Sequence, residues 1–177
     1  MIRRLAPIER SKIADHLKRL DSGDRYMRFE TAASDNFIDA YVRGIRFTAD
    51  VAYGAFDDNL VLRGFSHICF SRGSADVGLS VERDCRGQGF GTKLLDKSIR
   101  IARLRRAKTF TSMCLMQNRW MLRAMSARGF DITREFDTAI AMADLDPPNV
   151  MTLGIEIAEE NMAWMNYAEK FWFGLWD

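Results

Sequence analysis

Residues 81–95, VERDCRGQGFGTKLL, place Gly87, Gly89 and Gly91 at alternate positions between a segment typical of a strand and one typical of a helix. A dinucleotide-binding loop requires GxGxxG, so this GxGxG spacing brings the third glycine one residue early. A P-loop requires a lysine directly after its last glycine, whereas a threonine comes first here. Small residues at the start of a helix let backbone N–H groups converge on an anion such as pyrophosphate. The stretch therefore predicts an anion-binding loop, with a glycine-rich turn that holds no ligand as the alternative.

The first fifty residues predict a strand and two helices ahead of the main sheet. Residues 2–5 are typical of a short strand, and apolar residues recur at helical spacing over 7–20. Residues 21–24, DSGD, interrupt this pattern, and Ser34 with Asp35 offers the start of a second helix. Its expected inward face comprises Phe37, Ile38, Tyr41 and Val42.

The rest of the chain predicts a β-meander followed by alternating helices and strands. Residues 50–56 and 60–70 are rich in β-branched and aromatic residues and are joined by a turn, and 75–81 continues as a third strand. After the glycine loop, the pattern predicts a helix to about residue 106, a strand over 110–115, a helix from Asn118 to about Arg128 that ends at Gly129, and a strand over 136–145.

Length and composition predict one domain without a metal site or a membrane span. The chain has 177 residues, of which 47% are hydrophobic, and a formal net charge of +2. Cys69, Cys85 and Cys114 lack the spacing of a zinc site and the even count of a disulfide framework, so we expect reduced thiols, a cytoplasmic protein and no metal. No segment reaches the ~20 apolar residues of a membrane span, so no membrane partner is expected. The arginine cluster over residues 100–106 is interpreted as a solvated helix face, so nucleic acid is not expected either.

The segment Arg86-Gly87-Gln88-Gly89-Phe90-Gly91, with the strand before it and the amphipathic helix after it, resembles the R/Q-x-x-G-x-G/A motif of the GNAT superfamily. Members of this superfamily are acetyl-CoA-dependent N-acetyltransferases. The helix that Asn118 opens and that closes on Gly129-Phe130 is similar to the superfamily's second segment, and the order of elements matches over residues 2–145. The chain resembles in particular the acetyltransferase domain of bacterial protein-lysine acetyltransferases. The resemblance implies an α/β (α+β) fold with a mixed, mostly antiparallel central sheet flanked by helices.

The same resemblance implies acetyl-CoA as the co-substrate. In the superfamily, the backbone at the end of the motif strand, here Ser80 and Val81, pairs with the pantetheine arm as an added strand would, and Asn118 contacts the same arm. An unpaired sheet edge is a natural seat for an amide-bearing chain. The amides that would hold the pyrophosphate belong to Arg86, Gly87, Gln88, Gly89, Phe90, Gly91 and Thr92.

Acetyl transfer to an amine needs a base, and two carboxylates lie near the motif. Asp76 is ten residues before Arg86, where related acetyltransferases place a glutamate base, and it is the leading candidate. The alternative is an aspartate that caps a turn at the start of a strand. Glu82 is the rival base, with a solvent-facing carboxylate as its alternative. His67 is interpreted as a core or sheet-face histidine rather than a catalytic one.

One position departs from the superfamily pattern. Many members carry a tyrosine four residues before the glycine of Gly-Phe, and it protonates the coenzyme thiolate, whereas this chain has Met125. A methionine cannot donate a proton. Cys114 and Tyr53 are substitutes without specific support. The departure keeps open the alternative of a non-catalytic acetyl-CoA sensor or structural module.

The acceptor is expected to be a primary amine on a small molecule, a protein lysine or a protein N-terminus. Residues 16–29, HLKRLDSGDRYMRF, resemble the segment that forms much of the acceptor-site wall in the superfamily. A solvated basic helix end explains its arginines nearly as well. The candidate substrate residues are Arg25, Tyr26, Arg28 and Phe29.

Residues 149–177 are expected to form a helical extension of a domain that spans 1–148. So much aromatic surface cannot stay in water on a soluble monomer, and the acidic residues of the segment disfavour an anionic membrane. We therefore expect the extension to pack on protein, either across its own domain or against the second subunit of a homodimer. Its aromatic residues include Trp164, Phe171, Trp172, Phe173 and Trp176.

Overall fold

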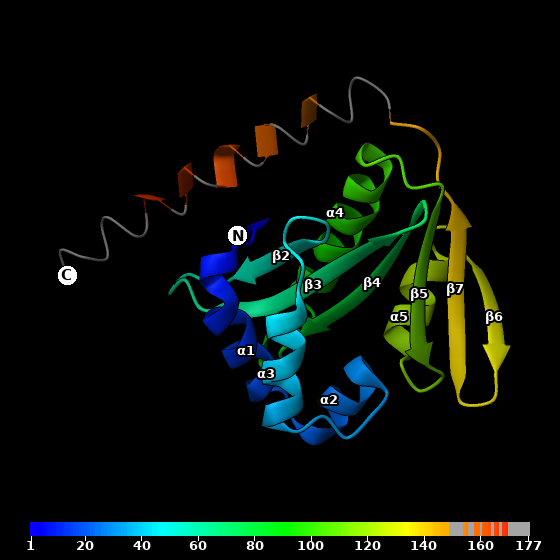
Figure 1. Ribbon diagram of the computed structural model, residues 1–177, viewed down its shortest axis with the longest axis horizontal. Helices are drawn as coiled ribbons and strands as arrows, with labels where there is room; N and C mark the ends of the chain where they lie inside the picture. The colour runs from blue at the N-terminus through cyan, green and yellow to red at the C-terminus, as the bar shows by residue number, and fades with distance from the viewer. Residues whose placement is uncertain (149–153, 156–157, 160, 164, 167, 170–177) are drawn as a thin grey trace.

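The computed structural model describes residues 1–148, 154–155, 158–159, 161–163, 165–166 and 168–169. A seven-stranded sheet with the order β1-β2-β3-β4-β5-β7-β6 runs through the described chain (Figure 1). All neighbours are antiparallel except β4 and β5, so the predicted mixed, mostly antiparallel sheet is confirmed. The strands are β1 (Ile2–Arg4), β2 (Val51–Phe56), β3 (Leu62–Ser71), β4 (Ser74–Val81), β5 (Thr109–Leu115), β6 (Asp131–Glu135) and β7 (Thr138–Asp144).

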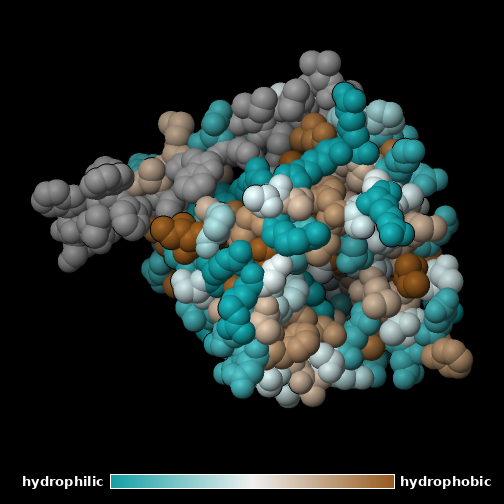
Figure 2. All heavy atoms as spheres, in the orientation of Figure 1, coloured by the Kyte–Doolittle hydropathy of each residue, from teal (hydrophilic) through white to brown (hydrophobic). Residues whose placement is uncertain are grey.

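Helices cover both faces of the sheet, and the alternation of buried residues along β2 shows how. Val51 and Tyr53 pack in one apolar core with α4 and α5, whereas Ala52 and Phe56 pack in a second core with α1 and α3. The α-helices are α1 (Arg10–Arg19), α2 (Ser22–Phe29), α3 (Asp35–Gly44), α4 (Phe90–Leu104) and α5 (Arg119–Ser126), and η1 (Pro7–Glu9) and η2 (Arg83–Cys85) are 3-10 turns. Figure 2 shows hydrophilic residues interspersed with hydrophobic ones over the face seen in Figure 1.

The sequence prediction missed two elements, α2 and β6. Three α-helices precede the main sheet instead of two, because the Asp21 side chain accepts a hydrogen bond from the Asp24 amide at 2.8 Å and caps α2. The predicted break is thus a helix start. A separate strand, β6, precedes β7, and the two are joined by a turn in which Phe136 has a φ of 51°. No residue of β6 is buried, so it lacks the apolar alternation that predicts a strand.

Beyond residue 148, the described residues are helical, and Glu159 forms ion pairs with α4 of the same chain. Glu159 lies 3.1 Å from the Lys97 ammonium and 3.0 Å from the Arg100 guanidinium. The predicted aromatic cluster at 164, 171–173 and 176 lies outside the described residues. Among the described helices, none is long and apolar enough to span a membrane.

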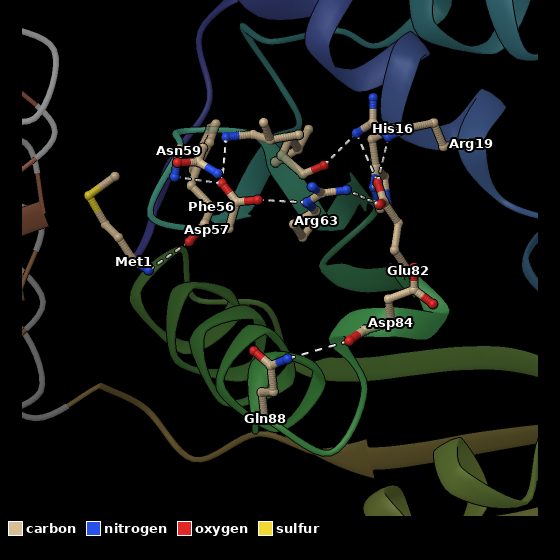
Figure 3. Close-up of polar contacts among 12 residues, drawn as sticks. Met1, His16, Arg19, Phe56, Asp57, Asn59, Arg63, Glu82, Asp84 and Gln88 are labelled. Atoms are coloured by element: carbon tan, nitrogen blue, oxygen red, sulfur yellow. Dashed lines mark hydrogen bonds and ion pairs between the residues drawn. The ribbon is translucent and has the colours of Figure 1, made fainter. Parts of the chain in front are cut away.

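A buried polar cluster docks α1 against the end of β4 (Figure 3). His16 is fully buried, with Nδ1 3.1 Å from Glu82 Oε1 and Nε2 2.9 Å from Ser80 Oγ. Arg19 Nε and Arg63 Nη1 donate to the same carboxylate at 2.9 and 2.8 Å. An ionised carboxylate only accepts, so His16 Nδ1 carries the proton and Nε2 accepts from Ser80.

Charge in this cluster is set by burial and by these hydrogen bonds. Burial alone would raise the pKa of Glu82, but hydrogen bonds from His16, Arg63 and Arg19 lower it from 4.5 to about 2. Burial lowers the pKa of His16 below its ordinary 6.5, so the imidazole stays neutral beside the carboxylate. Both folded-state pKa values lie below the unfolded ones. As the pH falls below about 6.5, these two groups therefore bind protons in the unfolded chain but not in the folded chain. The free energy of unfolding falls as a result.

We expect Glu82→Gln to lower the free energy of unfolding at pH 7 by about 3 kcal/mol, since it leaves the cluster without its anion. Urea denaturation should show that the stability difference between wild type and variant begins to narrow near pH 4.5 and is largely gone near pH 2, the folded-state pKa of Glu82. Glu135→Gln, at an exposed position of β6, is the matched control and should change little. Equal stability of Glu82→Gln and wild type at pH 7 would contradict the role assigned to the cluster.

Candidate active site

The site begins where β4 and β5 part. Their backbones pair only from Ser74 to Asp76 on β4, opposite Thr109 to Thr111 on β5. Beyond this point the two strands form opposite walls of a cleft of about 650 Å³. Residues 77–81 of β4 line one wall, and Ser112, Met113 and Cys114 of β5 line the other. The cleft therefore has an unpaired strand edge along its length.

The glycine loop forms one end of this cleft. Gly87 and Gly89 have φ values of 77° and 80°, a left-handed conformation that favours glycine, and Gly89 immediately precedes α4. A Cβ added at Gly87 would meet no atom within 4 Å, and one at Gly89 would meet only the Lys93 side chain at 3.9 Å. The surface over the loop is thus open, next to the positive end of a 15-residue helix. This geometry fits a bound pyrophosphate.

Almost all predicted coenzyme residues lie on this cleft. Gln88 is the exception, because its side chain turns to the Asp84 carbonyl oxygen at 3.4 Å (Figure 3). The Asn118 side chain accepts from the Met121 amide at 3.2 Å and caps α5. The predicted residues that line the cleft are Ser80, Val81, Arg86, Gly87, Gly89, Phe90, Gly91, Thr92 and Asn118.

Asp76 lies at the other end of the cleft, at the point where β4 and β5 part. Thr111 Oγ1 donates to its carboxylate at 3.0 Å. The side chain is exposed on the cleft, and partial desolvation of the carboxylate by the surrounding protein raises its pKa. The Thr111 hydroxyl and the charge of Arg28 act in the opposite direction. The carboxylate is therefore placed and tuned as a proton acceptor would be.

Glu82 is not brought to the cleft. It is only 8% exposed, so the predicted solvent-facing alternative is wrong, and its hydrogen bonds go to the cluster behind α1. With its pKa lowered to about 2, the carboxylate is a poor base near neutral pH. The structure separates the two candidate carboxylates into one on the cleft and one in a structural ion-pair cluster.

The four candidate substrate residues lie on helix α2, and only two of them reach the cleft. Arg28 and Phe29 line the cleft. Arg25 is turned away and donates to the carbonyl oxygens of Lys18, Leu20 and Ala33. Tyr26 is 45% exposed and is not part of the cleft wall. Asp24, one helical turn before Arg28, and Met27, next to Arg28 in the sequence, line it instead.

Sequence reasoning missed a group of polar residues beside Asp76. Tyr41 of α3, with His67 and Cys69 of β3, lines the cleft. Arg28 Nη2 donates to the Tyr41 hydroxyl at 2.8 Å, and this hydroxyl lies 2.8 Å from His67 Nδ1. Burial, together with the charge of Arg28, lowers the pKa of His67 to about 4, so the imidazole is neutral. The sequence did offer one signal, which is the polar ring of His67 at an inward position of a strand. A buried polar atom needs a hydrogen-bond partner, so such a ring indicates further polar residues nearby.

Asp50, His67 and Cys69 bring three potential metal ligands within 4.8 Å of one another. Arg46 already pairs with the Asp50 carboxylate at 3.0 Å. Burial raises the pKa of Cys69 to about 11, so its thiol stays protonated. These features favour a hydrogen-bonded cluster over a cation site.

The two candidate substitutes for a general acid, Tyr53 and Cys114, are placed differently. Tyr53 is fully buried in the core, as is Met125, and neither residue lines the cleft. Cys114 lines it, but burial raises the pKa of its thiol to about 11. An ordinary thiol has a pKa of about 8.5, so transfer of a proton from Cys114 to another thiolate is unfavourable.

Comparison with known proteins supplies the family. Residues 16–130 match the model of the Acetyltransferase (GNAT) family, and no curated protein matches the chain significantly. The GNAT domain of S. lividans PAT superposes with a TM-score of 0.71 at 18% identity, over 81% of this chain and 89% of that one. The yncA protein of Salmonella typhimurium, solved with its cofactor acetyl-CoA, superposes with a TM-score of 0.65 at 17% identity, over 85% and 96%. A ribosomal-protein-alanine N-acetyltransferase from Brucella melitensis gives 0.63 at 15% identity, over 82% and 99%.

At these identities the solved structures establish the shared fold, and the family match covers more than half of the chain. The motif loop, the parted strands and the fold agree with it. The chain belongs to the GNAT family of acetyltransferases.

Proposed function

We propose that this protein transfers an acetyl group from acetyl-CoA to a primary amine on a small molecule, a protein lysine or a protein N-terminus. The observation that carries the proposal is one continuous cleft that joins the glycine loop to Asp76. The structural neighbour from Salmonella typhimurium, which is described with acetyl-CoA, supports the choice of co-substrate.

The cleft residues fit this co-substrate along its length. The open surface over Gly87 and Gly89 would hold the pyrophosphate, and the unpaired edge of β4 from Val77 to Val81 would accept the amides of the pantetheine arm. When bound, acetyl-CoA supplies the thioester: the amine nitrogen bonds to the acetyl carbon, the C–S bond breaks, and the second proton of the nitrogen leaves with the sulfur as a free thiol.

Asp76 has the position and the environment of the base. An acceptor amine is an ammonium ion near neutral pH and must lose one proton before it can attack. The raised pKa of Asp76 makes this carboxylate a stronger proton acceptor than an aspartate of ordinary pKa. The Thr111 hydroxyl holds it at the mouth of the parted strands.

A non-catalytic acetyl-CoA sensor would share the glycine loop but would release no thiol. Incubation of the protein with acetyl-CoA and a panel of amines, with mass detection of free CoA and of acetylated amine, separates the two functions. Formation of both products supports the transferase. Tight coenzyme binding without either product would establish the sensor.

We expect Gly89→Val to weaken acetyl-CoA binding at least tenfold, because a β-branched residue disfavours a φ of 80° and adds atoms where the pyrophosphate would lie. Isothermal titration calorimetry measures the affinity. Gly73→Val is the matched control, since Gly73 has a φ of 83° in the turn between β3 and β4 and does not line the cleft. Undiminished affinity in a folded Gly89→Val variant would refute the anion-binding loop.

Asp76→Asn should lower kcat by about 10²- to 10⁴-fold and leave acetyl-CoA affinity near wild type, as expected for removal of a general base. In the wild type, activity should fall as the pH is lowered through the raised pKa of Asp76, because the protonated carboxyl cannot accept a proton. This acidic limb should be absent from the residual activity of the variant. Asp131→Asn, on exposed β6, is the control. Wild-type turnover by Asp76→Asn at every pH would rule out Asp76 as the base.

We also propose that residues 149–177 form an assembly element of a homodimer. Described side chains of this segment leave apolar surface open, with Ile155, Met162 and Met165 exposed by 44, 58 and 70%. Truncation after Pro148 should halve the mass measured by light scattering while the circular dichroism of the domain is retained. A soluble truncated protein with the mass of the full chain would contradict this proposal.

A further inference from the structure

Arg28 lies on the cleft wall, and no carboxylate of the described residues forms an ion pair with its guanidinium. Within the described part of the chain, its hydrogen bond goes to the Tyr41 hydroxyl at 2.8 Å, and its buried Nε atom has no partner. Arg25 of the same helix pairs with Asp35, and Arg86 of the cleft pairs with Asp24, both at 2.7 Å. A half-buried guanidinium that forms no direct ion pair is costly unless a ligand supplies an anion at contact distance.

The guanidinium of Arg28 is held in place inside the cleft. It lies 5.0 Å from the centre of the Phe29 ring and 5.5 Å from that of Tyr41, which are cation–π distances. It also lies directly over Gly78 of β4, where an added Cβ would collide with it. The absence of a side chain at Gly78 thus gives Arg28 its position, and the aromatic rings keep the donors oriented.

Asp76 and Gly78 lie on the same face of β4, since side chains two residues apart in a strand point the same way. Their Cα atoms are about 7 Å apart on strand geometry. The cleft therefore presents an anion, Asp76, and a cation, Arg28, side by side at the end away from the glycine loop. The charge of Arg28 also lowers the pKa of Asp76, in keeping with this placement.

We propose that the acceptor is a small amine that carries a carboxylate close to its amino group, as an amino acid does, and that Arg28 binds this carboxylate. The amine then faces Asp76. A planar guanidinium binds a carboxylate with two parallel hydrogen bonds, and such a pair orients the ligand as well as holding it. This inference rests on the proposed acetyl transfer and names the substrate class of the same site.

The test compares each of the common L-amino acids with its carboxamide, in which the carboxylate charge is removed and the amine is kept. Wild type should acetylate one or more amino acids with a KM well below that of the matched carboxamide. Arg28→Gln should raise KM for the amino acid by about 10- to 100-fold, and it should leave KM for the carboxamide and for acetyl-CoA near wild type. Arg43→Gln removes the same charge from an exposed position of α3 and should change neither KM.

Equal effects of Arg28→Gln on the amino acid and on the carboxamide would overturn the inference, because they would show that Arg28 only shapes the cleft through Tyr41. Wild-type preference for carboxamides or for lysine-containing peptides would also overturn it, while the transferase function would stand. If wild type acetylates no amine, the proposed function fails. Calorimetry of the same amino acids with the protein–CoA complex then decides the carboxylate site alone: binding that Arg28→Gln abolishes supports it, and no binding refutes it.

Discussion

Backbone pairing between β4 and β5 stops after three residue pairs, although both strands continue beyond this point. β4 stays paired with β3 from Ser74 to Val81, while β5 stays paired with β7 from Thr109 to Leu115. The two halves of the sheet separate, and their facing edges keep backbone N–H and C=O groups that no strand satisfies. A ligand with amide groups can complete these edges, which connects the architecture of the sheet directly to the chemistry of the family.

Two carboxylates six residues apart have opposite properties because their neighbours differ. Asp76 faces the cleft with one hydroxyl partner, and burial raises its pKa. Burial would raise the pKa of Glu82 as well, but one imidazole and two guanidinium groups lower it to about 2. A base must take up a proton near its working pH, whereas a structural anion must keep its charge. The Glu82 cluster also holds Ser80 through His16, so the contacts that dock α1 steady the strand beside the cleft.

Most elements could be predicted because their signals are local. The Ser34 side chain accepts from the Phe37 amide and caps α3 as expected, and Gly129 has a φ of 78° after α5. The prediction failed where a local signal had a second meaning or was absent. Asp21 caps a helix within a segment that had been interpreted as a break, and β6 is exposed throughout most of its length. The coenzyme part of the site was predictable for the same reason as the helices, since one continuous motif carries it.

The sequence by itself determined the glycine loop, the helix that follows it and the family, because backbone conformation at Gly87 and Gly89 depends on residues next to them in the chain. Only the tertiary structure decided which side chains share the acceptor end of the cleft. Arg28, Tyr41 and His67 come from three elements, and their contacts depend on how α2 and α3 pack over β3 and β4. Charge states also depend on the tertiary structure. Burial and hydrogen-bond or ion-pair partners set each pKa, and both arise from residues that are distant in sequence and meet only after folding.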